Sequence, residues 1–315
     1  MRSFPQLLMQ TPRGSSRLSL AEGHLWQMGR GRDNAIPIFD HCASRHHGLI
    51  RLLGMDRYYL FDQGSRNGTY VNGKRIQLPT LLNHGDIINI GETTLEFVFP
   101  PMEPAEEHQE LTPIPQLIST LVVQMPAYPK LAQQISERVQ AEIVYQWFSR
   151  SIDAINSGGS QVDQVIGGAI VAIKIHQIPP DLLQVAIDEI LPVFTIIKQV
   201  HLLSEELNQQ FQLPLSLGIS AGINTSCAEI YNGYPTVQTL DTIVQETLTL
   251  QSANQITGQD VSISAQTRQR TPYSILLPFK QYLVNLPDTE QPTITYAGSL
   301  AGVVEFLDKV SVVFS

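Results

Sequence analysis

Cysteine is nearly absent from this sequence. Only two of its 315 residues are cysteines, Cys42 and Cys227. They are too few and too isolated to build a disulfide framework or a zinc site. Their scarcity favours a protein of a reducing compartment, and we expect no metal or other cofactor.

Long apolar runs are also missing. No segment approaches the roughly twenty apolar residues that a membrane-spanning helix needs, and no signal peptide begins the sequence. We therefore expect a cytoplasmic protein without a membrane span. The tripeptide Asn67-Gly68-Thr69 matches the glycosylation pattern, but without a signal peptide we interpret that match as coincidence.

Several catalytic signatures are lacking as well. No glycine-rich loop of the GxxxxGK type occurs, which excludes that kind of nucleotide site. Cys227 has no histidine near it in sequence, so we interpret it as a buried thiol rather than a nucleophile. The pair His46-His47 has no further metal ligands beside it, and a bracing role fits it better.

What is present indicates a folded protein with two domains. Hydrophobic residues make up 43% of the chain and charged residues 16%, as in globular proteins. Residues 1–100 hold 11 Lys+Arg against 8 Asp+Glu, a net charge of +3, and residues 101–315 hold 9 against 21, a net charge of −12. The acidic remainder argues against a nucleic-acid partner, while the mildly basic front part suits an anionic one.

Three polar clusters lie between apolar runs in residues 28–76. They are Gly29-Arg30-Gly31-Arg32, Ser44-Arg45-His46-His47 and Ser65-Arg66-Asn67-Gly68-Thr69. The runs between them, such as residues 35–38 and 57–61, are typical of short strands. The pattern therefore predicts three loops at the ends of strands, where binding residues usually lie.

The residue types in these loops favour one class of ligand. Arginine offers a flat, permanent charge that matches phosphate oxygens, and a serine hydroxyl adds a neutral donor. An asparagine amide can bind a peptide backbone through its donor and its acceptor together. Asn67-Gly68 and Asn72-Gly73 are also ordinary hairpin-turn dipeptides, so each pair alone indicates only a turn. Together the clusters point to a phosphorylated side chain.

The order and spacing of the clusters resemble the forkhead-associated (FHA) domain, a two-sheet β-sandwich that reads phosphothreonine peptides. The motifs that carry the resemblance are Gly29-Arg30, Ser44-Arg45-x-His47, Ser65-x-Asn67-Gly68-Thr69, Val71-Asn72-Gly73 and Leu82-x-x-Gly85-Asp86-x-Ile88-x-Ile90-Gly91.

The resemblance implies roles for three residues at the phosphate. Arg30 and Ser44 hold it, and Arg45 supports it. Arg66 stands where many members of the family carry threonine. It either adds a charge-assisted contact or faces water.

Three further residues receive roles from the same resemblance. Asn67 hydrogen-bonds the peptide main chain beside the phosphothreonine, and His47 braces the loop from inside. Asn72 either hydrogen-bonds the peptide main chain, as Asn67 does, or braces the loop from inside, as His47 does.

A proline-rich and acidic segment at residues 101–116 predicts a semi-rigid linker between domains at residues 1–100 and 117–315. In the second domain, apolar spacing predicts helices at residues 131–152, 181–210 and 239–251. Strand-like runs occupy residues 117–123, 162–175, 215–230, 261–263 and 274–277. This alternation predicts an α/β (α+β) domain behind an all-β sandwich, and residues 281–315 receive no assignment.

Residues 115–280 resemble the catalytic domain of class III nucleotidyl cyclases, through residues 121–125, 147–148, 158–169 and 217–222. That family binds two metal ions with two aspartates, and the resemblance puts these positions at Gln124 and Gly168. An amide is a poor magnesium ligand and a glycine side chain is none.

The other catalytic positions of the cyclase family are also changed. The base-reading lysine would fall at Gln164, and the asparagine and arginine of the late helix near Gln245 and Thr249. Asp163 remains, and we interpret it as a solvated turn residue. Losing one transition-state donor costs about a hundredfold to a thousandfold in rate, and losing the metals costs more. We therefore expect no enzyme activity.

These interpretations predict a non-enzymatic signalling adaptor. Its FHA domain would bind a phosphothreonine-containing protein, and its degenerate cyclase-like domain would form a homodimer. Two alternatives stay open: an active class III cyclase regulated by phosphopeptide binding, and a cyclase-like pocket that senses nucleotide without turnover.

Overall fold

The structure, a computed structural model, describes residues 4–11, 14–99, 113–177, 187–231, 233–271, 276, 278–286 and 292–313. Contacts group the chain into two compact units, residues 1–108 with 130–149 and residues 109–129 with 150–315. Most of the expected linker, residues 101–112, lies outside the described residues, and its end already belongs to strand β12 (Ile114–Gln124). The domain limits at residues 100 and 117 stay a prediction.

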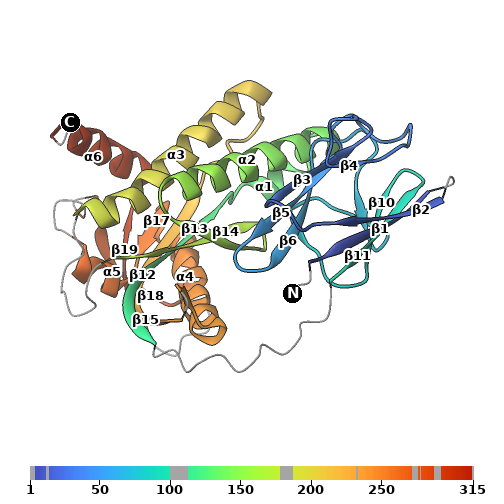
Figure 1. The fold of residues 1–315 in the computed structure, drawn as a ribbon. Coiled ribbons are helices and arrows are strands. Elements are labelled where there is room, and N and C mark those ends of the chain that lie inside the picture. Colours follow the sequence, from blue (N-terminus) through green and yellow to red (C-terminus); the bar gives the residue numbers. More distant parts are fainter. Residues whose placement is uncertain are drawn as a thin grey trace. The chain divides into compact units, whose positions relative to one another are not determined.

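Two sheets build most of the first unit (Figure 1). One has the strand order β2-β1-β11-β10-β7-β8 and the other β4-β3-β5-β6-β9. Every pair is antiparallel except β3 with β4. The strands are β1 (Gln6–Thr11), β2 (Gly14–Ser19), β3 (Leu25–Gly29), β4 (Ile36–Pro37), β5 (Gly48–Leu53), β6 (Arg57–Asp62), β7 (Tyr70–Val71), β8 (Lys74–Arg75), β9 (Thr80–Leu81), β10 (Asp86–Ile90) and β11 (Thr93–Val98). The predicted all-β sandwich is confirmed.

Alternating side chains of both sheets form the core of the sandwich. In β11, buried and half-buried residues alternate along the strand, which turns Leu95 and Phe97 inward. They join one cluster with Trp26 and Leu60 of the opposite sheet. Burying a side chain of this size contributes about 1.5–3 kcal/mol, so this core gives the loops at the strand ends a rigid base.

A mixed sheet forms the centre of the second unit. Its order is β13-β14-β12-β15-β17-β19-β18, and β16 pairs with β15. Besides β12, the strands are β13 (Gln161–Ile166), β14 (Ala169–Ile175), β15 (Ser220–Tyr231), β16 (Tyr234–Pro235), β17 (Val261–Ile263), β18 (Lys280–Val284) and β19 (Thr293–Gly298). Among the described strands of this sheet only β15 and β17 run parallel, so antiparallel pairing dominates the predicted α/β (α+β) fold.

The described helices are α1 (Tyr128–Leu131), α2 (Glu137–Ser157), α3 (Ile187–Phe211), α4 (Val237–Thr257), α5 (Ala265–Arg270) and α6 (Leu300–Val313). Of these, α2, α3 and α4 were predicted from apolar spacing. Helix α4 is longer than predicted because its ends are set by caps: Thr236 accepts a bond from the Thr239 N–H, and Gly258 takes a left-handed φ of 65°. Figure 1 shows α3 and α4 on opposite faces of the sheet.

Several sequence-based assignments need correction or completion. Residues 281–315, left unassigned, contribute β18, β19 and α6, while the strand predicted at residues 274–277 lies outside the described residues except for residue 276. Cys227 is exposed rather than buried, because the alternation of β15 turns it outward. Among the described helices, none is long and apolar enough to cross a membrane.

Asp163 is not a solvated turn residue. It is fully buried on β13, at a register shift between Val162 and Gln164. Its carboxylate accepts a hydrogen bond from the hydroxyl of Tyr234 at 2.8 Å. A buried carboxylate must be bonded in this way, and sequence spacing alone could not reveal a partner so far along the chain.

Candidate functional site

The three predicted loops meet at the end of the sandwich. The Arg30 N–H donates to the Ser44 carbonyl at 2.9 Å, and the Gly31 N–H donates to the Arg45 carbonyl at 3.0 Å. The third loop joins them where the Arg66 N–H donates to Ser44 Oγ at 3.2 Å. Ser44 therefore lies at the point where all three loops meet.

The charged side chains at this junction are open to solvent. Arg30, Arg45 and Arg66 are exposed, and Ser44 is half-buried. Within the part of the chain that the structure describes, their three guanidinium groups form no hydrogen bond or ion pair. A backbone held in place and guanidinium groups without an internal partner together suit the binding of an anion.

Asn67 is held at the rim of the same junction. Its Nδ2 donates to the Cys42 carbonyl at 2.7 Å, which ties the third loop to the second. Asn67 is exposed, and its side-chain oxygen remains able to accept a bond from a peptide N–H.

His47 lies under the junction and joins two loops. It is fully buried; its Nδ1 accepts from the Ser44 N–H at 3.0 Å, and its Nε2 lies 3.2 Å from the Gly68 carbonyl. Because Nδ1 accepts, the ring is neutral with its proton on Nε2. Burial lowers the pKa of His47, which agrees with that neutral form. The geometry fits the brace that the resemblance implied.

Asp62 is a structural centre that the sequence reading missed. Its carboxylate accepts from the Ser65 N–H at 2.8 Å and from the hydroxyls of Ser65 and Thr69 at 2.6 Å each. The Gly68 N–H in turn donates to Ser65 Oγ at 3.0 Å. An acid three residues before a serine, at the end of a strand, is the sequence signal that could have predicted this turn.

Asn34 is a second missed residue, and it fixes the first loop. It is buried, and its Nδ2 donates to the carbonyls of Gly31 at 2.9 Å and Arg45 at 2.7 Å. Gly29 makes this packing possible, because a Cβ there would lie 2.3 Å from the Arg45 carbonyl oxygen. The first two loops are therefore clamped together along their backbones.

Asn72 lies on the β7–β8 turn, and its bonds lead to β10 rather than to the three loops. Its Nδ2 donates to Asp86 Oδ1 at 2.8 Å, and its Oδ1 accepts from the Ile87 N–H at 2.9 Å. Its φ of 51° suits asparagine in such a turn. Both ends of the amide are therefore in use within the sandwich.

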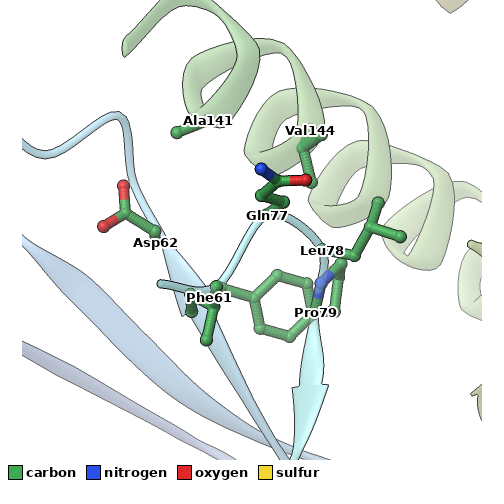
Figure 2. Close-up of a pocket in the computed structure, with 8 residues that line it drawn as sticks. Phe61, Asp62, Gln77, Leu78, Pro79, Ala141 and Val144 are labelled. Carbon is green, nitrogen blue, oxygen red and sulfur yellow. The ribbon is translucent and has the colours of Figure 1, made fainter. Parts of the chain in front are cut away.

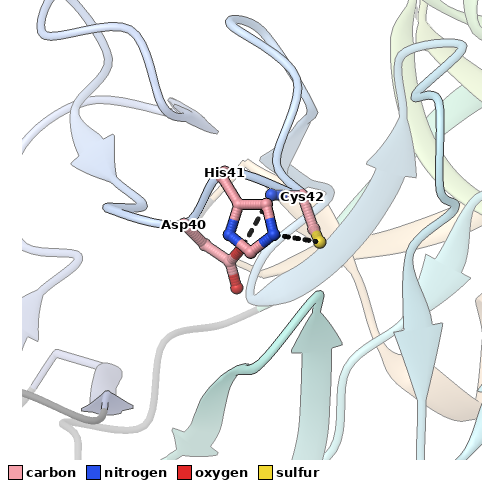
Figure 3. Close-up of side chains that lie close together, drawn as sticks. All are labelled: Asp40, His41 and Cys42. Carbon is pink, nitrogen blue, oxygen red and sulfur yellow. Dashed lines mark hydrogen bonds and ion pairs between the residues drawn. The ribbon is translucent and has the colours of Figure 1, made fainter.

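Asp40, His41 and Cys42 lie together in the second loop (Figure 3). Their possible ligand atoms lie within 4.8 Å of one another. The Asp40 oxygens, however, already accept from the backbone N–H groups of Cys42 and Glu92 at 2.7 Å each. Burial acts to raise the pKa of Asp40, but these donors outweigh it and hold that pKa below its usual value. We interpret Asp40 as a brace for the loop.

A small pocket in the first unit lies where α2 packs against the sandwich (Figure 2). Its lining residues are Phe61, Asp62, Ile76, Gln77, Leu78, Pro79, Ala141 and Val144. Its volume of about 10 Å³ suits one water molecule and no larger ligand. Nearby, Arg75 forms an ion pair with Glu137 and lies so close to Gly68 that a Cβ there would be 2.5 Å from Arg75 Nε.

In the second unit, the two positions that the resemblance assigns to metal ligands do lie together. Gln124 pairs with Ala169 across β12 and β14, directly beside Gly168. Gly167 and Gly168 have φ angles of 55° and 85° and form the tight β13–β14 turn. Neither Gln124 nor Gly168 carries a charge.

The side chains around Gln124 are bonded to one another. Gln251 Nε2 lies 3.5 Å from Gln124 Oε1 and donates to Ser220 Oγ, which also accepts from Asn254 Nδ2 at 2.9 Å. Asn254 Oδ1 accepts from the Ser262 hydroxyl. Sequence reasoning missed this network because its members come from β12, β15, α4 and β17.

A row of Ser119, His176 and the half-buried Glu189 also belongs to the second unit. Ser119 Oγ lies 2.7 Å from His176 Nε2, and His176 Nδ1 lies 3.3 Å from Glu189 Oε2. Ser119 also bonds the Thr225 hydroxyl at 2.8 Å, and both Ser119 and His176 are buried. Burial lowers the pKa of His176, against the opposite effect of Glu189. Because Ser119 and His176 are buried and Ser119 also bonds Thr225 of the sheet, we interpret this row as structural.

Comparisons with known proteins identify part of the first unit. The FHA domain family model matches residues 26–91. "Angiogenic factor with G patch and FHA domains 1" of Mus musculus is 39% identical over 79 residues, 22% of this chain and 11% of that protein, so the chain spans about a tenth of that relative's length.

The chain is also similar to solved structures over part of its length. A structure from a study of phosphothreonine-dependent FHA domain interactions is 30% identical, with a TM-score of 0.29, and the match covers 32% of this chain and 100% of that one. The adenylyl cyclase CyaB from P. aeruginosa is 15% identical, with a TM-score of 0.44, and the match covers 60% of this chain and 96% of that one. The family match and the two-sheet fold agree: residues 26–91 form an FHA domain.

Proposed function

We propose that this chain is a non-enzymatic signalling adaptor whose FHA domain captures a phosphothreonine-containing protein. The observation that carries the proposal is the junction at Ser44, where Arg30 and Arg66 are bonded to one residue through the backbone. Arg30 and Ser44 hold the phosphate in this proposal, and Arg45 adds charge beside them. Arginine suits the task because its fork matches phosphate oxygens.

The two asparagines take different roles. Asn67 contacts the peptide main chain, because it lies at the junction and keeps its side-chain oxygen available. Asn72 is a brace of the β7–β8 turn, since its amide already bonds Asp86 and Ile87. Arg66 adds a charge-assisted contact beside Asn67, because its guanidinium makes no bond with any described residue.

The second unit has no catalytic role in this proposal. Metal-assisted cyclisation needs carboxylates where Gln124 and Gly168 lie, and the Gln124 amide instead faces the bonded network of Gln251 and Ser220. The unit serves to pair with a second copy of the chain. Two FHA domains in one dimer would bind a doubly phosphorylated or clustered partner with avidity.

Fluorescence anisotropy with phosphothreonine peptides tests the binding proposal. The full chain should bind phosphorylated members of a peptide library and ignore their unphosphorylated forms. Arg30→Ala or Ser44→Ala should weaken binding roughly tenfold to a hundredfold, because each removes a bond to a charged phosphate. Arg17→Ala, at an exposed arginine of β2 away from the loops, is the matched control. Equal retention of unphosphorylated peptides would refute the proposal.

Sedimentation velocity of the full chain tests the dimer. The proposal expects a species of twice the 35.0 kDa chain mass at micromolar concentration. A monomer at every concentration up to the solubility limit would remove the second unit's proposed role and leave the binding role intact.

A further inference from the structure

Asp40, His41 and Cys42 bring three different metal-binding groups together on one turn of the second loop, and the proposed function gives none of them a contact to the ligand (Figure 3). The side chain of His41 is 87% exposed and Cys42 is half-buried, so solvent reaches both. The side chain of Asp40 is only 5% exposed. A nitrogen, a sulfur and a carboxylate are therefore available at one accessible place.

The distance between the nitrogen and the sulfur fits a tetrahedral metal ion. His41 Nε2 lies 3.5 Å from Cys42 Sγ. Zinc binds histidine nitrogen at about 2.0–2.1 Å and thiolate sulfur at about 2.3 Å, and at the tetrahedral angle such bonds put the two ligand atoms about 3.5–3.6 Å apart. The ion would replace the thiol proton between the two atoms, and that proton would pass to solvent. Neither side chain needs to change its place.

Asp40 supports the other side of the imidazole ring. Its Oδ1 lies 3.7 Å from His41 Nδ1, so its charge favours the proton on Nδ1 and leaves the lone pair of Nε2 for a metal ion. A carboxylate beside the second ring nitrogen is the usual companion of a metal-binding histidine. The backbone N–H groups that hold the Asp40 carboxylate in place therefore also fix the direction of the ring.

A second carboxylate, that of Glu92, lies near the same turn. The Glu92 N–H donates to Asp40 Oδ2, and Gly91 lies so close that a Cβ there would be 2.7 Å from the Cys42 Cβ. Burial and the negative charges of Asp40 and Glu92 raise the pKa of the Cys42 thiol, which shows that both carboxylates act on the sulfur. Two negative charges beside a nitrogen and a sulfur attract a divalent cation.

We propose that His41 Nε2 and Cys42 Sγ bind a zinc ion, that Asp40 orients the histidine, and that Glu92 and water complete the coordination. Thiolate and imidazole together favour zinc over magnesium or calcium. Two isolated cysteines exclude a site of several cysteines, but a mixed site of this kind needs only one. The inference does not depend on phosphopeptide binding.

Absorption spectroscopy with Co²⁺ in place of Zn²⁺ tests the site on the metal-free full chain. Co²⁺ should give a thiolate-to-metal charge-transfer band and the visible bands of tetrahedral coordination, saturating at one equivalent, and Zn²⁺ should remove them. Cys42→Ser should abolish the charge-transfer band. The matched control is Cys227→Ser, at the other, exposed cysteine, which should keep it.

Competition with a chromophoric zinc chelator measures the affinity of each variant for Zn²⁺. His41→Ala and Cys42→Ser should each weaken Zn²⁺ binding roughly tenfold to a hundredfold, and Glu92→Gln by less. His24→Ala, at an exposed histidine away from the turn, should leave the affinity unchanged. Urea unfolding without metal should give the same stability for His41→Ala as for the unaltered chain, because that side chain is exposed.

Three results would overturn the assignment. The first is an unaltered chain that gives no cobalt band removable by Zn²⁺. The second is a charge-transfer band that survives Cys42→Ser or that Cys227→Ser removes, since the sulfur ligand would then be another. The third is a Zn²⁺ affinity that His41→Ala leaves unchanged. This last variant decides the matter if Cys42→Ser does not fold, and failure of phosphopeptide binding would leave all three results valid.

Discussion

Polar side chains gather at strand ends in both units, but their bonding differs. At the sandwich loops, backbone and amide bonds fix the positions of Arg30 and Arg66, while their charged groups meet no partner among the described residues. Around Gln124, in contrast, the polar side chains bond one another. Polar groups that bond one another are not available to a ligand, whereas the exposed arginines of the loops are.

The largest expected effect concerns catalysis in the second unit. Incubation of the chain with ATP or GTP and manganese should give no cyclic nucleotide above background. The double variant Gln124→Asp/Gly168→Asp should also stay at background. The resemblance to class III nucleotidyl cyclases puts a transition-state arginine at Thr249 and a base-reading lysine at Gln164, and the double variant restores neither.

Mass spectrometry of the reaction mixture checks both results. Suppose that the unaltered chain makes cyclic nucleotide and that mutation within residues 115–280 abolishes this activity. The second unit would then be an enzyme, and the contrast between a ligand-binding unit and a non-catalytic unit would be wrong.

The next effect concerns the brace of the binding loops. His47→Ala removes the acceptor of the Ser44 N–H, leaves a cavity, and should lower the free energy of unfolding by about 2–4 kcal/mol. Urea unfolding measures this. His24→Ala, at an exposed histidine, is the matched control and should stay within about 0.5 kcal/mol. Equal stability of the two variants would show that His47 does not hold the loops.

A smaller effect separates the two Asn-Gly turns. Asn67→Ala should weaken phosphopeptide binding roughly tenfold by loss of the main-chain contact, with a minor loss of stability. Asn72→Ala should leave the affinity unchanged and lower stability by about 1 kcal/mol, because it removes bonds inside the sandwich. Anisotropy and urea unfolding of both variants check this. If Asn72→Ala weakens binding and Asn67→Ala does not, the contact to the peptide main chain belongs to Asn72.

The smallest effect is a pH dependence shared by the two units. Burial lowers the pKa of both His47 and His176, so the unfolded chain binds protons near pH 6.5 that the folded chain does not. The neutral histidines therefore contribute their full share to the free energy of unfolding above pH 6.5. That contribution is lost as the pH falls below 6.5 and the unfolded chain takes up the protons. Urea unfolding between pH 7.5 and 5.5 should show this decline, and His47→Ala should flatten part of it. Stability that rises on acidification would contradict the neutral assignments.

The sequence predicted the positions of the three loops better than it predicted the residues that support them. Arg30, Ser44 and Asn67 could be named because their chemistry and order form a pattern along the chain. Asn34 and Asp62 could not, because their roles depend on carbonyls and hydroxyls that only folding brings to them.

In the second unit, too, contacts between residues far apart in the sequence could not be predicted. The apolar pattern predicted the course of α2, which buries one face, and the strand at β17, which is buried throughout. Spacing could not show that Asp163 is buried against Tyr234, because that contact joins residues far apart in the sequence. It also left β18 and β19 unassigned, since the burial of both strands alternates only weakly along the sequence.

A crystal structure of the chain with a bound phosphothreonine peptide tests the central claim most directly. The account predicts the phosphate within hydrogen-bond distance of the Arg30 guanidinium and of Ser44 Oγ, and the Asn67 amide bonded to the peptide main chain. A phosphate bound elsewhere on the chain, with Arg30 and Ser44 turned away from it, would contradict the account.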